Sequence, residues 1–172
     1  MSRAFVKEQD GNLAEDDVPA RPQSSHPNYV TAGGLAMLRA RQQELLDKHG
    51  ELSARSSDDP LLHQQLQQIS RDLAFVTGRL ERAIPVDPAT QPQGEIRFGA
   101  VVEVSDEENK LRRFAIVGED EADVAAGRVS WISPLAQAMM GAQLGDRVVW
   151  HRPAGDSGLT IVSIHYPGTE KD

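Results

Sequence analysis

Residues 60–83 read PLLHQQLQQISRDLAFVTGRLERA, and their apolar side chains recur at alternating steps of four and three residues. Such steps are the a/d pattern of a coiled coil, held here for three heptads. The positions concerned are Leu62, Leu66, Ile69, Leu73, Val76, Leu80 and Ala83. Because Pro60 directly follows Asp59, the stretch also carries a cap and a proline suited to a first helical turn. It predicts a helix that buries one stripe against a second helix.

The preceding stretch predicts that second helix. Thr31 is expected to cap its N-terminus, and a weaker apolar stripe follows at Leu35, Leu38, Leu45 and Leu52, with Gln42 and His49 at seam positions between them. Residues 56–60, SSDDP, then give a stop and restart signal. Because so short a connection makes the helices antiparallel, residues 31–84 predict a helical hairpin, called the finger here. Each arm of roughly 24 residues would be about 36 Å long.

The second half of the chain predicts a small α+β domain. Residues 85–94 form a proline-containing linker, and from there on apolar residues alternate with a period of two. The strands are predicted at 94–104, 111–117, 128–132, 146–151 and 159–166, with a hairpin turn at 105–110. Ser133 and Pro134 open a short helix that Gly141 ends. We therefore expect residues 95–172 to form an antiparallel sheet wrapped around one helix.

Composition excludes several classes of protein. The 172 residues carry 18 Lys and Arg against 26 Asp and Glu, and residues 84–172 hold 8 of the basic and 14 of the acidic ones. Such an acidic chain is not expected to bind free DNA. It contains no cysteine, which excludes disulfides and fits a reducing compartment. The sequence offers no apolar stretch long enough to span a membrane, so we expect a cytoplasmic protein.

Residues 1–30 differ from both of these parts. They are polar, contain Pro19, Pro22 and Pro27, and carry an acidic run at residues 15–17. A segment of this composition cannot bury enough apolar surface to fold by itself. We expect an arm that is flexible or draped over the rest of the chain.

Several motifs in order resemble the Gre transcript-cleavage factor family of bacterial transcription elongation factors. The resemblance covers residues 29–167 and leaves only the arm outside. It rests on the entry Tyr29-Val30-Thr31, on FGAVVEV at 98–104, on RFAIVGEDEAD at 113–123, on ISPLAQAMMGAQLGD at 132–146 and on PAGDSGLTIVSIHYP at 153–167. The resemblance implies a coiled-coil finger followed by a C-terminal domain of FKBP-like fold.

The resemblance also implies a partner and a mode of action. The C-terminal domain of these factors binds RNA polymerase at the rim of its secondary channel, and the finger enters the channel, where it comes near the nascent RNA. Acids at the finger tip help the polymerase to hold its second Mg²⁺ and to hydrolyse backtracked RNA, a task that suits hard carboxylate oxygens. The hydrolysis belongs to the polymerase, so this chain is expected to be no enzyme, to hold no cofactor of its own and to be a monomer.

The finger tip departs from the family pattern of Gly-Asp, two residues, Glu-Asn and then Tyr. Asp58 and Asp59 keep acids at the tip without that spacing, and each arm is about one heptad shorter, or about 10 Å of reach. Asp59 is a candidate catalytic acid or simply the cap of the second helix, and Asp58 is a functional acid or a solvated turn residue. Two versions stay open: a cleavage-stimulating factor, and a non-cleaving occupant of the channel that resembles the regulator of nucleoside diphosphate kinase.

The candidate polymerase-binding residues are Trp131, Ile132, Ser133 and Pro134. Ser133-Pro134 matches the family's Ser-Pro before the short helix, although a helix cap explains this pair equally well, and Ile132 replaces a polar residue. Trp131 is a candidate aromatic anchor for the partner.

Other chemistry is weaker in this sequence. The five histidines lack metal-ligand spacing, although His151 and His165 would be close if their strands paired suitably, and the acids at 119–123 are expected to form a solvated turn. Finger arginines such as Arg79 either lie near RNA and channel walls or form ordinary helix salt bridges. A prolyl isomerase, suggested only by the FKBP-like shape, and a coiled-coil adaptor for another partner are the rivals from other classes.

Overall fold

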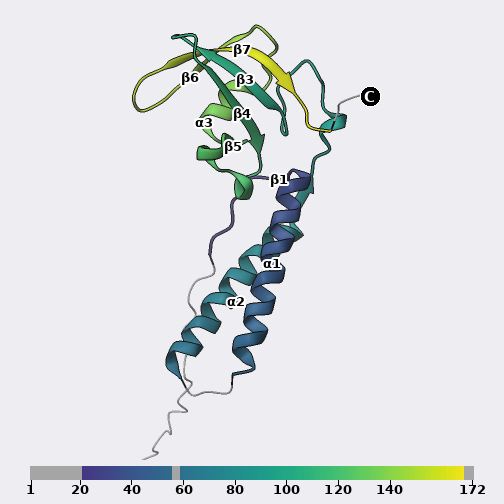
Figure 1. The fold of residues 1–172 in the computed structure, drawn as a ribbon, viewed down its shortest axis with the longest axis vertical. Helices are drawn as coiled ribbons and strands as arrows, with labels where there is room; N and C mark the ends of the chain where they lie inside the picture. The colour runs from purple at the N-terminus through teal and green to yellow at the C-terminus, as the bar shows by residue number, and fades with distance from the viewer. Residues whose placement is uncertain (1–20, 56–58, 169–172) are drawn as a thin grey trace, which may run out of the picture.

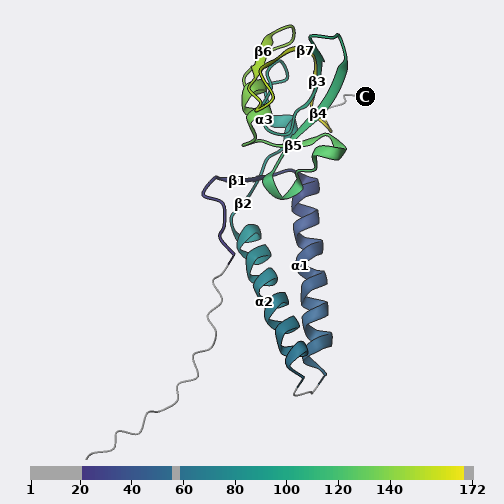
Figure 2. The ribbon, with the colours of Figure 1, turned by 90° about the vertical axis from the view of Figure 1, so that its left-hand side faces the viewer.

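The computed structural model describes residues 21–55 and 59–168, in which two long helices project from one end of a curled sheet (Figures 1 and 2). Helix α1 spans Ala32–Ser53 and α2 spans Pro60–Glu81. Thr31 caps α1, as predicted, because its Oγ1 accepts a hydrogen bond from the Gly34 amide at 2.9 Å. Each helix has 22 residues, so the finger is about 33 Å long.

The seam between α1 and α2 confirms the heptad prediction. Leu38 and Leu45 of α1 are buried together with Val76 of α2, and Ile69, Leu73 and Leu80 pack against them. The weaker stripe of α1 is completed by a polar contact, in which Gln42 Nε2 donates to Thr77 Oγ1 at 3.0 Å. The two helices therefore stabilise each other mainly through one apolar face each.

The C-terminal part is a five-stranded sheet of order β5-β4-β3-β7-β6, curled around one helix. The elements are β3 (Val101–Asp106), β4 (Leu111–Val117), β5 (Arg128–Ser130), α3 (Pro134–Met139), β6 (Arg147–Trp150) and β7 (Ser157–His165). Leu135, Ala136 and Met139 of α3 pack into the core formed by the sheet. The α+β fold is thus as expected.

The sheet is mixed, whereas an antiparallel one was expected. Strands β3, β4, β6 and β7 pair antiparallel, but β5 runs parallel to β4. The reason is the crossing between them, which contains the short 3₁₀ turns η2 (Glu119–Glu121) and η3 (Val124–Ala126). This connection brings the chain back alongside the last three residues of β4, 115–117, so that β5 runs in the same direction as β4.

The prediction of a strand from residue 94 is wrong for its first seven residues, because β3 begins only at Val101. Gly99 has a φ of +87°, which breaks an extended run. Ile96 and Phe98 are buried nonetheless, and the Ile96 amide donates to the Ala142 carbonyl at 2.9 Å. The Tyr166 hydroxyl fixes the same segment by donating to the Glu95 carbonyl at 2.6 Å, and burial raises the pKa of this tyrosine.

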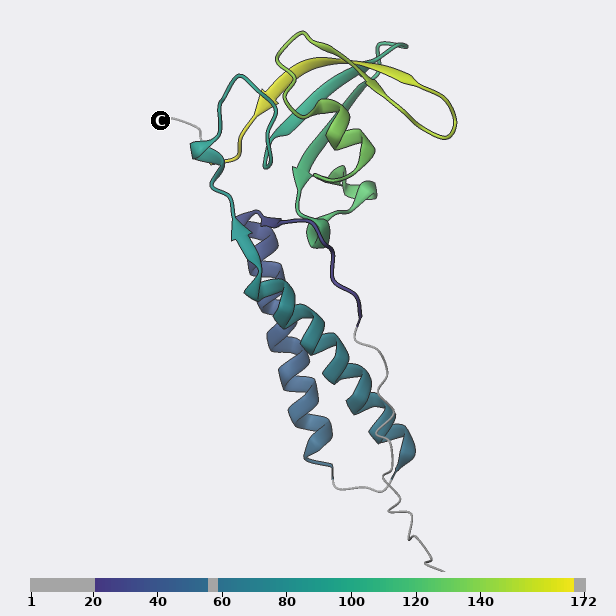
Figure 3. The ribbon, with the colours of Figure 1, turned by 180° about the vertical axis from the view of Figure 1, so that it is seen from behind.

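Residues 21–30 run beside the finger and reach the sheet domain (Figure 3). Residues 28–30 form β1 (Asn28–Val30), which pairs parallel with β2 (Ala83–Pro85) directly after α2. The 3₁₀ turn η1 (Pro88–Thr90) follows on the way to the sheet. The start of α1 and the end of α2 are therefore tied together where the finger meets the domain.

Candidate functional site

At the finger tip, Asp59 caps α2. Its Oδ1 accepts a hydrogen bond from the Leu61 amide at 3.0 Å, and Pro60 occupies the first helical position. A carboxylate at this place also gains from the positive end of the helix dipole. Of the two alternatives for Asp59, the structure thus displays the cap. Asp58 lies outside the described residues.

The four candidate polymerase-binding residues do not share one surface. Ser133 caps α3 by accepting from the Ala136 amide at 3.2 Å, and Pro134 is exposed at the first helical position. Trp131 instead packs toward residues 21–30, with its ring 5.1 Å from that of Tyr29 and 6.1 Å from that of His26. Ile132 is half-buried beside it. Trp131 is therefore engaged within the chain.

Ser133 and Pro134 line a groove of about 820 Å³ between α3, β4, η3 and the end of β6. Its apolar lining includes Phe114, Val124, Leu135 and Trp150. Its basic residues are Arg112, Arg113, His151 and Arg152, in a domain whose charge is otherwise acidic. An apolar groove with a basic rim is suited to a partner segment that is apolar on one face and acidic beside it.

Sequence reasoning missed most of this groove. Val124, 82% exposed, gives no periodic signal because it lies in a 3₁₀ turn. Besides Ser133 and Pro134, the adjacent pair Arg112-Arg113 is a signal in the sequence, as a basic pair in an acidic domain. Only the curl of the sheet brings these residues to the edge of α3.

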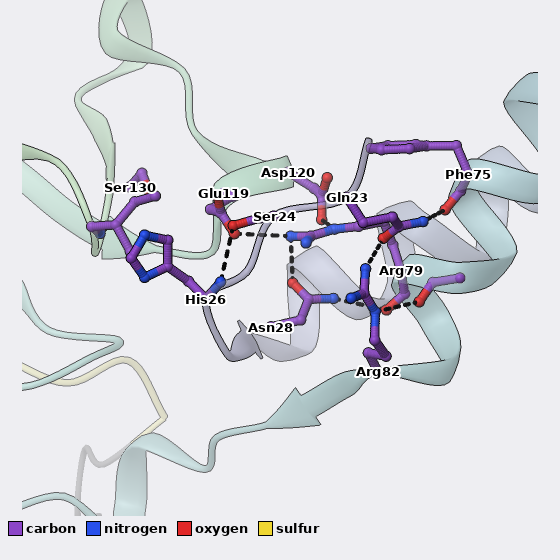
Figure 4. Close-up of polar contacts among 12 residues, drawn as sticks. Gln23, Ser24, His26, Asn28, Phe75, Arg79, Arg82, Glu119, Asp120 and Ser130 are labelled. Carbon is purple, nitrogen blue, oxygen red and sulfur yellow. Dashed lines mark hydrogen bonds and ion pairs between the residues drawn. The ribbon is translucent and has the colours of Figure 1, made fainter. Parts of the chain in front are cut away.

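The base of the finger holds a second group of charges, which we call the Arg79 cluster (Arg79, Asn28, Glu119 and Asp120; Figure 4). The Arg79 side chain is only 2% exposed and donates to Asp120 Oδ2 at 2.6 Å, to Glu119 Oε2 at 3.4 Å and to Asn28 Oδ1 at 2.5 Å. Nearby, Thr31 Oγ1 donates to Glu121 Oε2 at 2.5 Å. The expected solvated turn at 119–123 is therefore wrong for its first three acids, because they contact the finger.

Gly118 permits this approach of the acidic turn to the finger. A Cβ atom at this position would lie 2.5 Å from the Tyr29 carbonyl oxygen of β1. No side chain fits at that distance, so glycine is needed where the turn crosses β1.

Comparisons with known proteins agree with these features. The model of the C-terminal domain of the GreA/GreB transcription elongation factors matches residues 91–166. The transcription elongation factor GreB of Neisseria meningitidis serogroup B is 32% identical over 153 residues, which cover 81% of this chain and 94% of GreB. The factor GreA of Zymomonas mobilis is 32% identical over 138 residues, which cover 77% of this chain and 87% of GreA. The chain belongs to the GreA/GreB family of transcription elongation factors.

Among solved structures, this Gre-family chain is similar to GreA factor homolog 1 (Gfh1) of Thermus thermophilus. The two are 22% identical, with 81% of this chain and 99% of Gfh1 covered, at a TM-score of 0.39. A whole-chain superposition at this level adds nothing to the sequence matches.

Membership in the family settles the class of activity. Gre factors are non-enzymatic cofactors of RNA polymerase, so this chain is a transcription elongation factor and no enzyme, and the prolyl-isomerase alternative is dropped. The family implies RNA polymerase as the partner and no cofactor held by the factor itself.

Residues 21–55 and 59–168 of this Gre-family chain contain neither a membrane-spanning helix nor a metal-binding cluster of side chains. No helix in these ranges is long and apolar enough to cross a membrane. The same ranges contain no group of three or more His, Asp or Glu side chains placed to hold a metal ion. His151 directly follows Trp150, which pairs with the first residue of β7, Ser157. His165 is the last residue of β7 and pairs with Val101, so the two histidines lie near opposite ends of this strand.

Proposed function

We propose that this Gre-family factor docks on RNA polymerase through the groove beside Ser133 and Pro134 and inserts its finger into the secondary channel. The basic and apolar lining of the groove supports docking on a protein segment that is acidic and amphipathic. In this proposal residues 31–84 act as the finger, 85–94 as the linker and 95–172 as the docking domain. The factor acts as a monomer in the cytoplasm, where the polymerase works.

The finger is proposed to act by occupying the channel without stimulating RNA cleavage. The observation that carries this version is the Asp59 carboxylate, which caps α2 and so serves the helix that it begins. The Asp59 oxygen that accepts the Leu61 amide is engaged in the cap, and Asp59 does not hold Mg²⁺ by itself, since Mg²⁺ is held by several oxygen ligands. Any Mg²⁺ near the tip would then be the polymerase's own, held by the polymerase.

RNA cleavage in stalled, backtracked polymerase complexes tests the mode of action. The expected result is that the protein alone shortens the RNA no faster than the intrinsic rate. When a cleavage-stimulating GreB is present, adding this protein as its competitor should reduce the shortening that GreB stimulates. Shortening that the protein itself stimulates, and that is lost in Asp58→Ala/Asp59→Ala, would overturn this version and support the cleavage-stimulating one. The variant Asp59→Asn keeps a capping oxygen and separates loss of charge from loss of the cap.

A matched pair of substitutions tests the docking groove. Val124→Asp places an acid in the groove at a side chain that is 82% exposed, whereas the control Val162→Asp changes a 40% exposed valine of β7 that does not line the groove. A substitution at the centre of an interface should weaken polymerase binding about tenfold or more. Equal binding by the two variants would place the docking surface elsewhere.

A further inference from the structure

Residues 21–30, called the strap here, contact α2, and Gln23 lies against Phe75 and Arg82 in Figure 4. Gln23 Nε2 donates to the Phe75 carbonyl at 2.9 Å, and Gln23 Oε1 accepts from Arg82. The Arg21 guanidinium lies 4.3 Å from the centre of the Phe75 ring, within the range of a cation–π contact. The strap thus binds α2 over two turns of the helix.

The strap also enters the Arg79 cluster. Asn28 is 4% exposed, and its Nδ2 donates to the Arg79 carbonyl at 2.7 Å while its Oδ1 accepts from the Arg79 guanidinium. The same guanidinium binds Asp120 of the sheet domain. Asn28 therefore joins finger and domain at one buried point.

The third attachment of the strap is to the loop that leads to the docking groove. The rings of His26 and Tyr29 both contact the Trp131 ring edge-on, and Tyr29 also lies 5.8 Å from Phe98. Trp131 stands two residues before Ser133, which lines the groove. One segment thus contacts the finger, the junction and the docking loop.

We propose that the strap sets the angle of the finger relative to the docking groove, with Gln23 as a positioning residue. The proposal rests on the proposed function, because this angle determines where the tip lies once the groove is docked. Without the strap, the described contacts between finger and domain are concentrated at Arg79 and Thr31. Because the finger is about 33 Å long, a small rotation at these two contacts moves the tip a long way. Arg21, Gln23 and His26 precede residues 29–167, which carry the Gre-family motifs, so these strap contacts come in addition to those motifs.

The angle can be measured in the free protein. The chain lacks cysteine, so Glu51→Cys near the tip and Glu108→Cys in the β3–β4 hairpin give two unique sites for spin labels, and pulsed electron paramagnetic resonance gives the distance between them. The intact strap should give one narrow distance distribution. Since a net hydrogen bond contributes modestly, losing both bonds of Gln23 in Gln23→Ala should raise the share of reoriented molecules about tenfold.

A stronger variant and a matched control make the measurement decisive. Arg21→Ala/Gln23→Ala/His26→Ala removes the strap side chains that contact Phe75, Arg82 and Trp131, and should broaden the distribution further. Gln43→Ala is the control, because Gln43 is an exposed glutamine whose side chain donates to Asp47 within α1 and not to the strap. An unchanged distribution in the triple variant would overturn the proposal, as would equal broadening in the control.

Polymerase assays separate this proposal from the proposed function. The triple strap variant should reach its half-maximal effect on elongation at the same concentration as the unaltered protein, since the groove is intact, but with a smaller maximal effect. A changed half-maximal concentration with an unchanged maximum would contradict a positioning role. If the unaltered protein fails to bind polymerase, the proposed function fails while the distance measurement still decides the role of the strap.

Discussion

The acidic runs at the tip and at the base of the finger, residues 58–59 and 119–121, are similar in sequence but have different structural roles. At the tip, Asp59 accepts a backbone amide and caps α2. At the base, Glu119 and Asp120 surround the buried guanidinium of Arg79 and join two parts of the fold. The comparison shows that the role of an acid depends on what lies opposite it. A helix end needs only a local acceptor, whereas a buried cation needs paired carboxylates.

The largest effect is expected at the base. Arg79→Ala leaves Asp120 and Asn28 without their buried partner, and removing one member of a buried charge network costs about 3–5 kcal/mol. Urea denaturation should show this loss of unfolding free energy. The control Arg71→Ala removes a partly exposed arginine that donates an exposed hydrogen bond to Gln68 on the same helix, and should change the unfolding free energy by at most about 0.5 kcal/mol. A similar loss in both variants would contradict the difference between buried and exposed charge.

A pair of glycines tests how closely the base is packed. Gly118→Ala would place a Cβ atom 2.5 Å from the Tyr29 carbonyl and should destabilise the protein by about 1–3 kcal/mol. Gly50→Ala, near the tip end of α1, meets nothing within 4 Å and should stabilise the helix by about 0.5–1 kcal/mol. Thermal unfolding should therefore move in opposite directions for the two variants. If both variants raised the unfolding temperature, the acidic turn would have to move far enough to accommodate the added Cβ atom at little cost.

The tip should respond less and in a way specific to the cap. Asp59→Ala removes the acceptor of the Leu61 amide and should cost about 1 kcal/mol, whereas Asp59→Asn keeps an acceptor and most of the stability. Hydrogen exchange at the Leu61 amide reports the cap directly. Equal exchange in the two variants would mean that charge, and not the cap, protects this end of α2.

A third acidic run, at 106–108, should show the smallest effect. The Lys110 and Glu108 amides donate to Asp106, which lowers the pKa of its carboxyl, chiefly through Lys110. Because the pKa is lower in the folded protein than in the unfolded one, the stabilisation is present above the unfolded value and is lost as pH falls through the folded one. NMR titration should place Asp106 below the pKa of an ordinary aspartate. A titration at or above the ordinary value would contradict a turn held by this carboxylate.

The local features of both regions could be predicted from sequence. Thr31, Asp59 and Ser133 all cap helices where a short polar residue precedes a helical pattern. The heptad seam of α2 follows from spacing alone. The first predicted strand was too long because a buried, alternating segment reads as a strand even when Gly99 turns the backbone out of it.

The contacts between distant segments could not be predicted in this way. Arg79 looks like an exposed helix arginine until Asn28 and Asp120 are placed against it, and nothing near Trp131 in the sequence indicates its ring contacts with His26 and Tyr29. The groove was missed for the same reason, since Val124 and Trp150 meet only through the curl of the sheet.

The sequence by itself determined the finger, the small α+β domain, the helix caps and the family, because these depend on periodicity, local hydrogen bonding and the order of motifs. Only the tertiary structure decided which charges are buried, which aromatic rings pack together and which side chains line the groove. Those properties depend on side chains that are 40 to 90 residues apart in the chain, as for Arg79 with Asp120 and Thr31 with Glu121. No local sequence pattern indicates that such distant residues are in contact.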